Sequence, residues 1–355
     1  FKIIKRSELL GEISKTGKCL AVAGTHGKTT TSAILAHLLV DANVKLTAFL
    51  GGISENYQTN LILNGRDFTV VEADEFDRSF LKLSPFIVGI TSMDADHLDI
   101  YGDEATIKQA FVEFASLVPE DGFLLHKKGL PLNGLTVAVE EEADFEAQNV
   151  KIKNGVYMFD FKSPKFTVYD IMLNLPGRHN LFNATLALGM AVCSGVPFDS
   201  LPKALISFKG VKRRFSYILK NENCVLIDDY AHHPEEINAV HQAVREMYPN
   251  QEILVVFQPH LFSRTRDFGD AFAKSLSLFD NILLLDIYPA REKPIEGINS
   301  QWLLNKINNQ HKQLISKESL PNAVKISKTP VIVMLGAGDI SELVNEVKEI
   351  LTDED

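Results

Sequence analysis

The sequence predicts an α/β protein of two domains, each built around a mainly parallel sheet. Three observations support this prediction. The chain of 355 residues is long for a single core, apolar strand-like runs alternate with helical stretches, and a glycine-rich loop separates the first strand from its helix. Ligands of such sheets bind at the carboxyl ends of the strands, so we expect the functional residues there.

Strand and helix patterns alternate along the first half of the chain. Apolar runs suited to strands occur at 68–72, 86–91 and 123–125, and helical stretches at 30–39, 107–117 and 183–193. Between 144 and 173 the pattern changes to short alternating strands at 150–153, 156–159 and 166–169. The first domain is therefore predicted to contain a mainly parallel sheet with a small antiparallel annex, closed by the last helix.

The second half returns to the α/β pattern after a segment at 197–215 that carries prolines, Gly210 and a basic cluster. We place the boundary in this segment, with a first domain of residues 1–208 and a second of residues 209–355. Strands are predicted at 224–227, 253–257, 282–285 and 331–335. The second domain is therefore expected to be a Rossmann-like α/β domain.

The loop after the first strand has the composition of a phosphate-binding loop (P-loop). It reads Gly24-Thr25-His26-Gly27-Lys28-Thr29-Thr30. Glycine lets the backbone approach a phosphate, amides at the helix start face an anion, Lys28 adds positive charge, and the Thr29 hydroxyl can bind Mg²⁺. The loop is shorter than the standard motif, because Val22 stands where that motif has its first glycine. The alternative is an ordinary glycine-rich turn.

Acidic residues and a histidine follow the next two predicted strands. One strand ends in Glu72-Ala-Asp-Glu-Phe-Asp77, and the other is followed by Asp94-Ala-Asp-His97-Leu-Asp99. Mg²⁺ prefers hard oxygen ligands, commonly one or two carboxylates together with phosphate and water. These strand ends therefore suit a metal beside the phosphate loop, and the alternative for each is an exposed acidic loop.

Two strand ends in the second half also carry charged and polar side chains. Arg213 and Arg214 precede Asp228-Asp-Tyr-Ala-His-His-Pro234, and Gln258-Pro-His260 is followed by Arg264 and Arg266. The aspartates and histidines could hydrogen-bond a ribose or orient a substrate, and the guanidinium groups could bind carboxylate or phosphate. Helix starts near Pro234 and after His260 would explain the same residues without a ligand. The residues alone leave both alternatives open.

Composition and charge restrict the class of protein. The net charge is -10, from 36 Lys and Arg against 46 Asp and Glu, so we do not expect a broad basic surface for nucleic acid. No apolar run reaches the length of a membrane span and none reads as a signal peptide, so we expect no membrane partner. Cys19, Cys193 and Cys224 are odd in number and far apart, which favours reduced core cysteines of a cytoplasmic protein.

The motifs, taken in order, resemble those of the Mur ligases. They are Gly-Thr-His-Gly-Lys-Thr-Thr-Thr, Glu-Ala-Asp-Glu, Asp-Ala-Asp-His-Leu-Asp-Ile-Tyr, Pro-Gly-Arg-His-Asn, Arg-Arg-Phe, Asp-Asp-Tyr-Ala-His-His-Pro, Gln-Pro-His and Tyr-Pro-Ala-Arg-Glu, between Cys19 and Asp339. The family has an N-terminal UDP-sugar domain, a central ATPase domain and a C-terminal domain that admits the amino acid. The resemblance implies that this chain carries the last two domains and lacks the first.

The resemblance also implies an activity and its reactants. ATP would phosphorylate the carboxylate of UDP-N-acetylmuramate, and L-alanine would attack the acyl phosphate to give an amide, as a step in peptidoglycan precursor synthesis. ATP and Mg²⁺ are the implied cofactors, and we expect a monomer or a weak dimer. The alternatives are a recycling ligase that joins a cell-wall peptide to the same sugar nucleotide, and an ATP-binding module without catalysis. Folate polyglutamylating ligases share the ATPase core and match the C-terminal motifs poorly.

Residue roles follow from the same resemblance. Lys28 would neutralise the transferring phosphoryl group, Thr29 and Glu72 would bind one Mg²⁺, and His97 would bind a second. His179 and Asn180 would contact the adenine side of the nucleotide, and Arg214 and Asp229 would reach the nucleotide from the C-terminal domain. The site of the amino acid and the intermediate would include His232, His260 and Arg264.

One position departs from the Mur ligase pattern, and two substitutions test the residue roles. Leu261 stands where some relatives carry arginine, so the contacts of that arginine are not transferred. We expect Lys28→Ala to abolish ATP turnover. We expect Asp229→Ala to weaken ATP use and to leave the fold intact.

Overall fold

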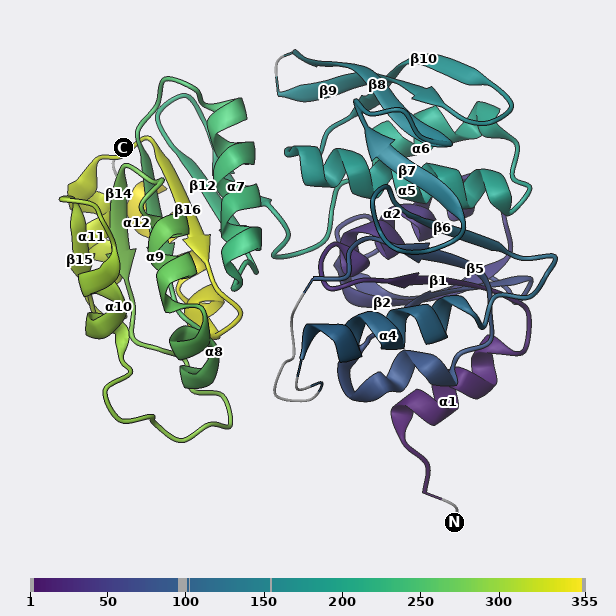
Figure 1. The fold of residues 1–355 in the computed structure, drawn as a ribbon. Helices are drawn as coiled ribbons and strands as arrows, with labels where there is room; N and C mark the ends of the chain where they lie inside the picture. The colour runs from purple at the N-terminus through teal and green to yellow at the C-terminus, as the bar shows by residue number, and fades with distance from the viewer. Residues whose placement is uncertain (1–2, 95–100, 102, 154, 353–355) are drawn as a thin grey trace. The chain divides into compact units, whose positions relative to one another are not determined.

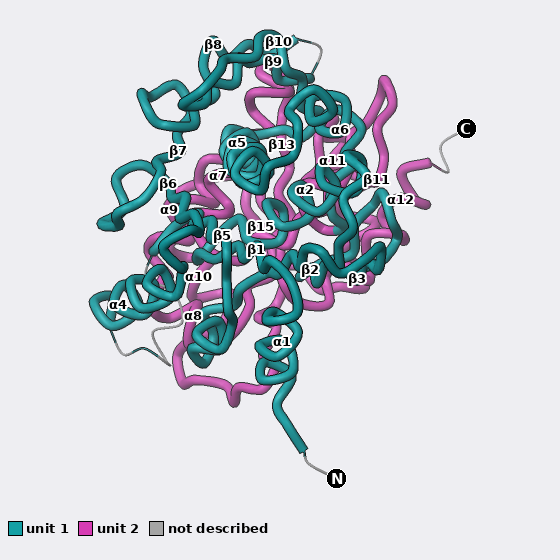
Figure 2. Tube along the Cα trace, turned by 90° about the vertical axis from the view of Figure 1, so that its right-hand side faces the viewer, with its two compact units in different colours: residues 1–212 teal, residues 213–355 magenta. Residues whose placement is uncertain are grey.

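A computed structural model describes residues 3–94, 101, 103–153 and 155–352 of the chain. It divides into two compact units, Phe1–Lys212 and Arg213–Asp355, coloured separately in Figure 2. Each unit contains one sheet with helices on both of its faces, as Figure 1 shows. The units are described one at a time.

The sheet of unit 1 has ten strands in the order β10-β9-β8-β7-β6-β5-β1-β4-β2-β3. Their bounds are β1 Lys18–Ala23, β2 Leu46–Ser54, β3 Thr59–Leu63, β4 Phe68–Glu72, β5 Pro85–Ile90, β6 Phe123–Lys127, β7 Leu135–Val139, β8 Phe145–Lys153, β9 Val156–Lys162 and β10 Thr167–Leu173. The pairs from β2 through β4, β1, β5, β6 and β7 to β8 are parallel. The parallel sheet is therefore confirmed.

The predicted antiparallel annex is an extension of this same sheet. β9 pairs antiparallel with both β8 and β10, and β8 joins the parallel strands through β7. The hairpin of β2 and β3 is also antiparallel and was not predicted. Its strands contain Gly51, Gly52 and several polar residues, so they lack the continuous apolar run that identifies a buried strand.

Helices cover both faces of this sheet (Figure 1). They are α1 Arg6–Ser14, α2 Lys28–Asp41, α4 Glu104–Ala115, α5 Arg178–Cys193 and α6 Leu201–Ser207, with the short 3₁₀ segments η1 Phe76–Lys82 and η2 Phe198–Ser200. Successive residues of β5 face the helices on opposite sides of the sheet. Val88 packs in a buried cluster with Phe111 of α4, whereas Gly89 faces Met190 of α5. Burial on both faces explains why β5, and β1 after Lys18, are apolar.

The sheet of unit 2 has six strands in the order β11-β12-β16-β13-β14-β15. The elements are β11 Ser216–Lys220, β12 Val225–Asp229, α7 Pro234–Met247, β13 Ile253–Phe257, α8 Phe262–Asp267, α9 Gly269–Leu276, β14 Asn281–Leu284, α10 Ser300–Lys306, β15 Lys312–Leu314, α11 Leu320–Ser327, β16 Val331–Leu335, η3 Asp339–Glu342 and α12 Val344–Thr352. All pairs are parallel except β11 with β12. The Rossmann-like prediction is confirmed as a mainly parallel α/β unit.

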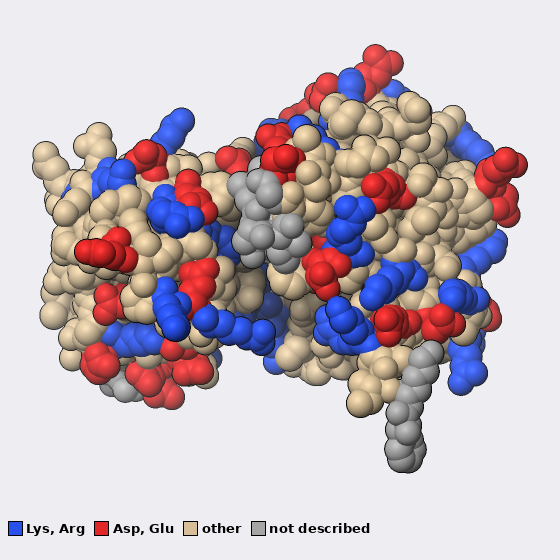
Figure 3. All heavy atoms as spheres, turned by 60° about the horizontal axis from the view of Figure 1, so that its bottom comes forward, with Lys and Arg blue, Asp and Glu red and all other residues tan. Residues whose placement is uncertain are grey.

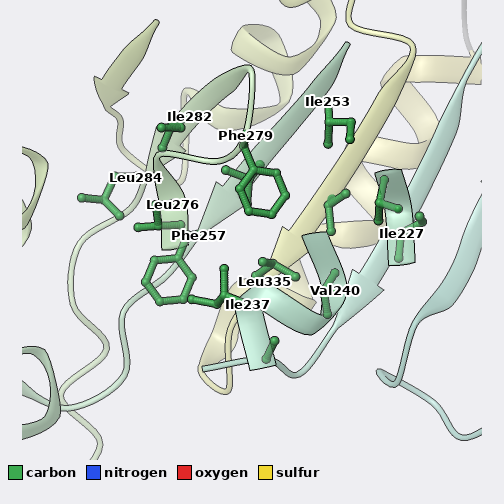
Figure 4. Packing of buried hydrophobic residues seen from close by; sticks show 14 of the residues in the cluster. Ile227, Ile237, Val240, Ile253, Phe257, Leu276, Phe279, Ile282, Leu284 and Leu335 are labelled. Carbon is green, nitrogen blue, oxygen red and sulfur yellow. The ribbon is translucent and has the colours of Figure 1, made fainter. Parts of the chain in front are cut away.

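The core of unit 2 lies on both faces of this sheet. Figure 4 shows one side, where Phe257 of β13 and Ile227 of β12 lie with Ile237 and Val240 of α7 and Phe279. The opposite side packs against α11 and α12 through residues such as Val324. Because β12, β13 and β16 are parallel, they end at the same edge of the sheet.

Several surface and composition properties can be read directly from the structure. In the part of the chain that is described, no helix is both long enough and apolar enough to cross a membrane. Basic and acidic side chains are interspersed on the face drawn in Figure 3. The three cysteines are free. Cys19 is buried in the core as expected, Cys224 is partly buried and packs against a hydrophobic cluster of unit 2, and Cys193 is partly buried.

Candidate active site

The predicted phosphate loop joins β1 to α2 in unit 1. β1 ends at Ala23 and α2 begins at Lys28, so the strand-loop-helix arrangement is confirmed. Gly24 has φ +132° and Gly27 has φ +81°, and both are conformations that other L-residues rarely adopt. The amides of the first turn of α2 have no partner inside the helix, which makes this end suitable for an anion.

The end of β5 supports the loop from one side. A Cβ at Gly24 would lie 2.0 Å from Thr91 Oγ1 and 2.8 Å from the backbone nitrogen of Ser92. The Thr91 hydroxyl donates to the carbonyl oxygens of Ala23 and His26. Ser92 Oγ accepts a 3.0 Å hydrogen bond from the His26 amide and shares a 2.7 Å hydrogen bond with the Thr25 hydroxyl. Only glycine permits this close approach at residue 24.

Helix α5 contacts the loop at its other glycine. A Cβ at Gly27 would lie 2.6 Å from Asn183 Oδ1. Asn180, one turn earlier, donates from Nδ2 to the carbonyl oxygen of Pro176 at 2.6 Å, and both asparagines are buried. His179 is half-buried in the first turn of α5. The structure thus brings helix α5 to the phosphate loop through Asn183, while contacts of His179 and Asn180 with adenine stay a prediction.

Lys28 extends across the loop to the end of β4. Its Nζ donates to the carbonyl oxygen of Gly24 at 2.7 Å and to Glu75 Oε1 at 2.8 Å. Burial opposes the charge of Lys28, but Glu75, with Glu72 and Asp74, raises its pKa above the ordinary value. Lys28 is therefore held as a cation at the phosphate loop.

Thr29 and Glu72, the predicted metal ligands, both lie against the same part of β2. The Gly51 amide donates to Glu72 Oε2 at 3.0 Å. A Cβ at Gly51 would lie 2.1 Å from that oxygen, and one at Gly52 would lie 3.1 Å from Thr29 Cγ2. Hydroxyl and carboxylate oxygens are the ligands that Mg²⁺ prefers, so the pair fits that metal.

Protein ligands alone would not complete such a metal site. The described residues include no group of three or more His, Cys, Asp and Glu side chains placed to hold an ion. Phosphate and water oxygens would therefore have to supply the remaining ligands, which is the usual arrangement for Mg²⁺. His97, assigned to a second metal, lies outside the described residues.

Other loop residues have identifiable positions. Thr25 and Thr30 are buried, and Thr30 lies in the first turn of α2. His26 Nε2 lies 3.9 Å from Asp94 Oδ2, while the Asp94 amide donates to Thr25 Oγ1 at 3.1 Å. Thr25 and His26 therefore make their side-chain contacts with the segment after β5, where a strand end was predicted to meet the loop.

In unit 2, Asp229 ends β12 with its carboxylate fully engaged by the backbone. Oδ2 accepts from the Phe215 amide at 2.6 Å, and Oδ1 accepts from the Ala231 amide at 2.7 Å. Burial raises the pKa of Asp229 to about 6, although Arg214 and both amides act in the opposite direction. The expectation that Asp229→Ala leaves the fold intact is therefore corrected, because the change would leave two buried amides without this acceptor.

The paired arginines of unit 2 surround Tyr230. The guanidinium carbons of Arg213 and Arg214 lie 4.8 and 5.0 Å from the centre of its ring. Arg213 Nη2 also donates to the carbonyl oxygen of Gly336 at 2.6 Å. Arg214 Nη1 lies 4.0 Å from Glu236 Oε1, and its side chain is 30% exposed. Arg213 thus contributes to the fold of unit 2, and Arg214 is the more accessible of the two.

The two histidines after Asp229 have different positions. His233 caps α7, since its Nδ1 accepts from the Glu235 amide and the Glu236 side chain accepts from the His233 amide. The predicted helix start near Pro234 is therefore confirmed. His232 is directed elsewhere: its ring centre is 5.9 Å from that of His260. Burial lowers the pKa of His232 to about 4, with Glu236 opposing the shift, so His232 is neutral at pH 7.

His260 and Arg264 lie on the neighbouring segment after β13. His260 is stacked on Tyr288, with ring centres 5.7 Å apart, and burial and Arg264 lower its pKa. Leu261 has φ +72°, and its amide donates to the carbonyl oxygen of Tyr288 at 2.9 Å. Helix α8 starts at Phe262, so the helix-start alternative is also confirmed and does not exclude a role for His260.

Sequence reasoning did not identify several of these contacts. Ser92 and Asn183 support the glycines of the loop, and Glu75 holds its lysine. Asn183 was missed because the predicted helix began at residue 183, whereas α5 begins at Arg178 and places Asn183 three residues after Asn180, on the same face. Glu75 could not have been identified as the partner of Lys28, since the acidic segment after β4 contains several carboxylates at similar spacing.

The two α/β units and the supported phosphate loop define a nucleotide-binding enzyme fold. Residues 22–191 match the model of the Mur ligase middle domain, and residues 213–338 match that of the Mur ligase, glutamate ligase domain. The chain belongs to the Mur ligase family.

Individual relatives agree with this family. The UDP-N-acetylmuramate–L-alanine ligase of Christiangramia forsetii is 61% identical over 354 residues, which cover 100% of this chain and 78% of that protein. The ligase of the same name from Flavobacterium psychrophilum is 60% identical over 351 residues, covering 99% of this chain and 78% of that protein. The crystal structure of UDP-N-acetylmuramate-alanine ligase MurC from Thermotoga maritima matches with a TM-score of 0.82 at 26% identity, covering 98% of this chain and 78% of that one.

Proposed function

We propose that this chain forms the ATP-using and amide-forming part of a ligase that joins L-alanine to UDP-N-acetylmuramate. The observation that carries the proposal is the 61% identity to a ligase of that name across 100% of this chain. A phosphate loop with its lysine suits the use of ATP by such a ligase, and this chain contains both. The supported class of reaction is activation of a carboxylate followed by amide formation.

The chemistry requires two steps because a carboxylate oxygen is a poor leaving group. In the first, a carboxylate oxygen of the muramic acid takes the γ-phosphoryl group of ATP, which gives an acyl phosphate and ADP. In the second, the amine of L-alanine attacks the carbonyl carbon, and the tetrahedral intermediate releases phosphate and one proton as the amide forms. Both steps build up negative charge on oxygen, which fixed positive charge and amide groups stabilise.

Unit 1 has the groups suited to the first step. The amides at the start of α2 and the Lys28 ammonium would bind the phosphates of ATP. Thr29 and Glu72 would hold Mg²⁺, which would neutralise charge on the phosphates when bound. The role of His97 in holding a second ion also belongs to this proposal.

Unit 2 has groups suited to the amino acid and the intermediate. Arg264 offers a guanidinium group for a carboxylate or phosphate oxygen. His232, neutral at pH 7, would orient a donor or accept a hydrogen bond, and Arg214 and Asp229 would contribute to the nucleotide side. The protein is proposed to act as a monomer or weak dimer in the cytoplasm, without a nucleic-acid or membrane partner.

The test is release of ADP by the full-length protein given ATP, Mg²⁺ and UDP-N-acetylmuramate. L-alanine is compared with a cell-wall tripeptide as the amine. Turnover with L-alanine supports the proposal, and turnover with the tripeptide alone assigns the protein to the recycling branch. ATP binding without turnover on either amine would instead support a module without catalysis.

A further inference from the structure

Lys28 and Glu75 form an ion pair that is almost completely enclosed. The Lys28 side chain is 13% exposed and that of Glu75 is 0% exposed. Nζ lies 2.8 Å from each carboxylate oxygen and donates to Oε1. Removing a carboxylate and an ammonium from water is costly, so such a pair requires good geometry and additional hydrogen bonds.

The placement is unusual for an anion-binding loop. A phosphate needs the positive charge of Lys28, yet Glu75 compensates that charge before any ligand arrives. Charge alone therefore does not explain why a buried glutamate lies here. Its effect on geometry does: the ammonium is held between Glu75 Oε1 and the carbonyl oxygen of Gly24, at 2.8 and 2.7 Å, so the lysine stem lies across the loop.

The backbone around Glu75 is itself fixed. The Tyr101 hydroxyl donates to the carbonyl oxygen of Glu75 at 2.5 Å. On the neighbouring residue, Asp74 Oδ1 accepts from the Phe76 amide at 3.1 Å, which shapes the turn after β4. The Glu75 carboxylate is therefore presented to Lys28 from a defined position on the sheet edge.

We propose that Glu75 is a positioning residue that holds the Lys28 ammonium at the place where phosphoryl transfer requires it. This inference rests on the proposed function, since it concerns the phosphate loop of the same site. Positive charge accelerates the transfer only if it lies where charge develops, and a displacement of about 1 Å can cost roughly 100-fold in rate. Glu75 thus acts through Lys28 and has no role as a ligand of the reactants.

Two variants of the full-length protein separate geometry from charge. Glu75→Gln keeps a hydrogen-bond acceptor at nearly the same place and removes the charge, while Glu75→Asp keeps the charge and withdraws it by one methylene. Asp67→Asn is the matched control, because it removes an acidic charge from an exposed residue directly before β4, at the end of that strand away from Glu75. Melting temperatures identify any variant that fails to fold.

The inference predicts a split between binding and turnover. Glu75→Asp, which withdraws the acceptor, should lose about 10- to 100-fold in kcat with an unchanged KM for ATP. Glu75→Gln, which keeps the acceptor in place, should lose much less, and Asp67→Asn should keep the wild-type values. A structural role alone would lower the melting temperature and the active fraction without this selective effect. Unchanged kcat in Glu75→Asp, a loss confined to KM, or an equal loss of kcat in Glu75→Gln would overturn the inference.

A crystal structure of the Glu75→Asp protein provides a readout that does not depend on turnover. The Lys28 ammonium should leave the carbonyl oxygen of Gly24, to which it donates at 2.7 Å in the wild type. An ammonium that keeps this contact in the variant would also overturn the inference. If the wild-type protein binds ATP but shows no ligase activity, the proposed function fails and this structural comparison still decides the role of Glu75.

Discussion

Gly24→Ala tests the geometry of the phosphate loop most directly. The added Cβ would lie 2.0 Å from Thr91 Oγ1 and 2.8 Å from the Ser92 nitrogen, which belongs to the backbone after β5. A hydroxyl can rotate away, but the backbone nitrogen cannot move without shifting that segment. The alanine would also have to adopt φ +132°.

The magnitude follows from these two costs. An unfavourable backbone conformation at a non-glycine residue costs about 1–3 kcal/mol. Overpacking in a rigid region adds about 1–3 kcal/mol. We therefore expect Gly24→Ala to lower the stability of the sheet around β1 by about 2–6 kcal/mol and to abolish ATP binding, because the loop amides would be displaced.

Gly129→Ala is the matched control within the same unit. Gly129 has φ +89°, and apart from its neighbours along the chain no atom of the described residues lies within 4 Å of the added Cβ. This variant therefore carries the backbone cost without the steric one, and it should bind ATP normally.

Hydrogen exchange of the β1 amides and equilibrium binding of ATP measure the two effects. Equal protection of β1 in both variants, or wild-type ATP affinity in Gly24→Ala, would refute the argument from close approach.

Four further predictions concern single side chains. Lys28→Ala should abolish ATP turnover, measured as ADP release, and should lower the melting temperature, because it leaves the buried Glu75 carboxylate without its partner; normal turnover would contradict the phosphate-loop assignment. Gly51→Ala should raise the Mg²⁺ concentration needed for ATP binding, because its Cβ would lie 2.1 Å from Glu72 Oε2; an unchanged requirement in a binding titration would argue against that metal site. Asp229→Ala should destabilise unit 2 by about 2–6 kcal/mol, since two buried amides lose their acceptor, as followed by Trp302 fluorescence in urea. The pKa of His232 is lowered from 6.5 to about 4, so the stability that depends on its neutral form is present above pH 6.5 and is lost as pH falls toward 4. The wild-type free energy of unfolding should therefore fall by up to about 3 kcal/mol from this residue between pH 6.5 and 4, and His232→Gln should remove that part of the fall.

Much of the sheet could be predicted because buried parallel strands have a simple pattern. The bounds of β4, β13 and β16 coincide with the predicted ranges, since each is a short apolar run between polar turns. The hairpin of β2 and β3 was missed because its strands contain two glycines and several polar residues and so lack a continuous apolar run. Local pattern therefore identified strands with a clear apolar run and failed for this hairpin, which lacks one.

The candidate site could be predicted only in part for a similar reason. Lys28 and Thr29 were identified because the phosphate-loop motif consists of consecutive residues at a helix start. The contacts of Asp229 with two amides became visible only in the structure, and they change the expected effect of its removal. A polar residue at a strand end can be located in the fold from the sequence. Whether its side chain binds a ligand or the backbone depends on its neighbours in the structure.

The phosphate loop owes its shape to elements that are distant in sequence. Ser92 follows β5, Asn183 lies on α5 and Glu75 follows β4, and each contacts or approaches a different part of the loop. A binding site for a charged group is effective when its amides and cations are already oriented, because no reorganisation is then needed during the reaction. In this unit that orientation comes from the convergence of strand ends at one sheet edge, so substitutions at these supporting residues should affect ATP use although none belongs to the loop itself.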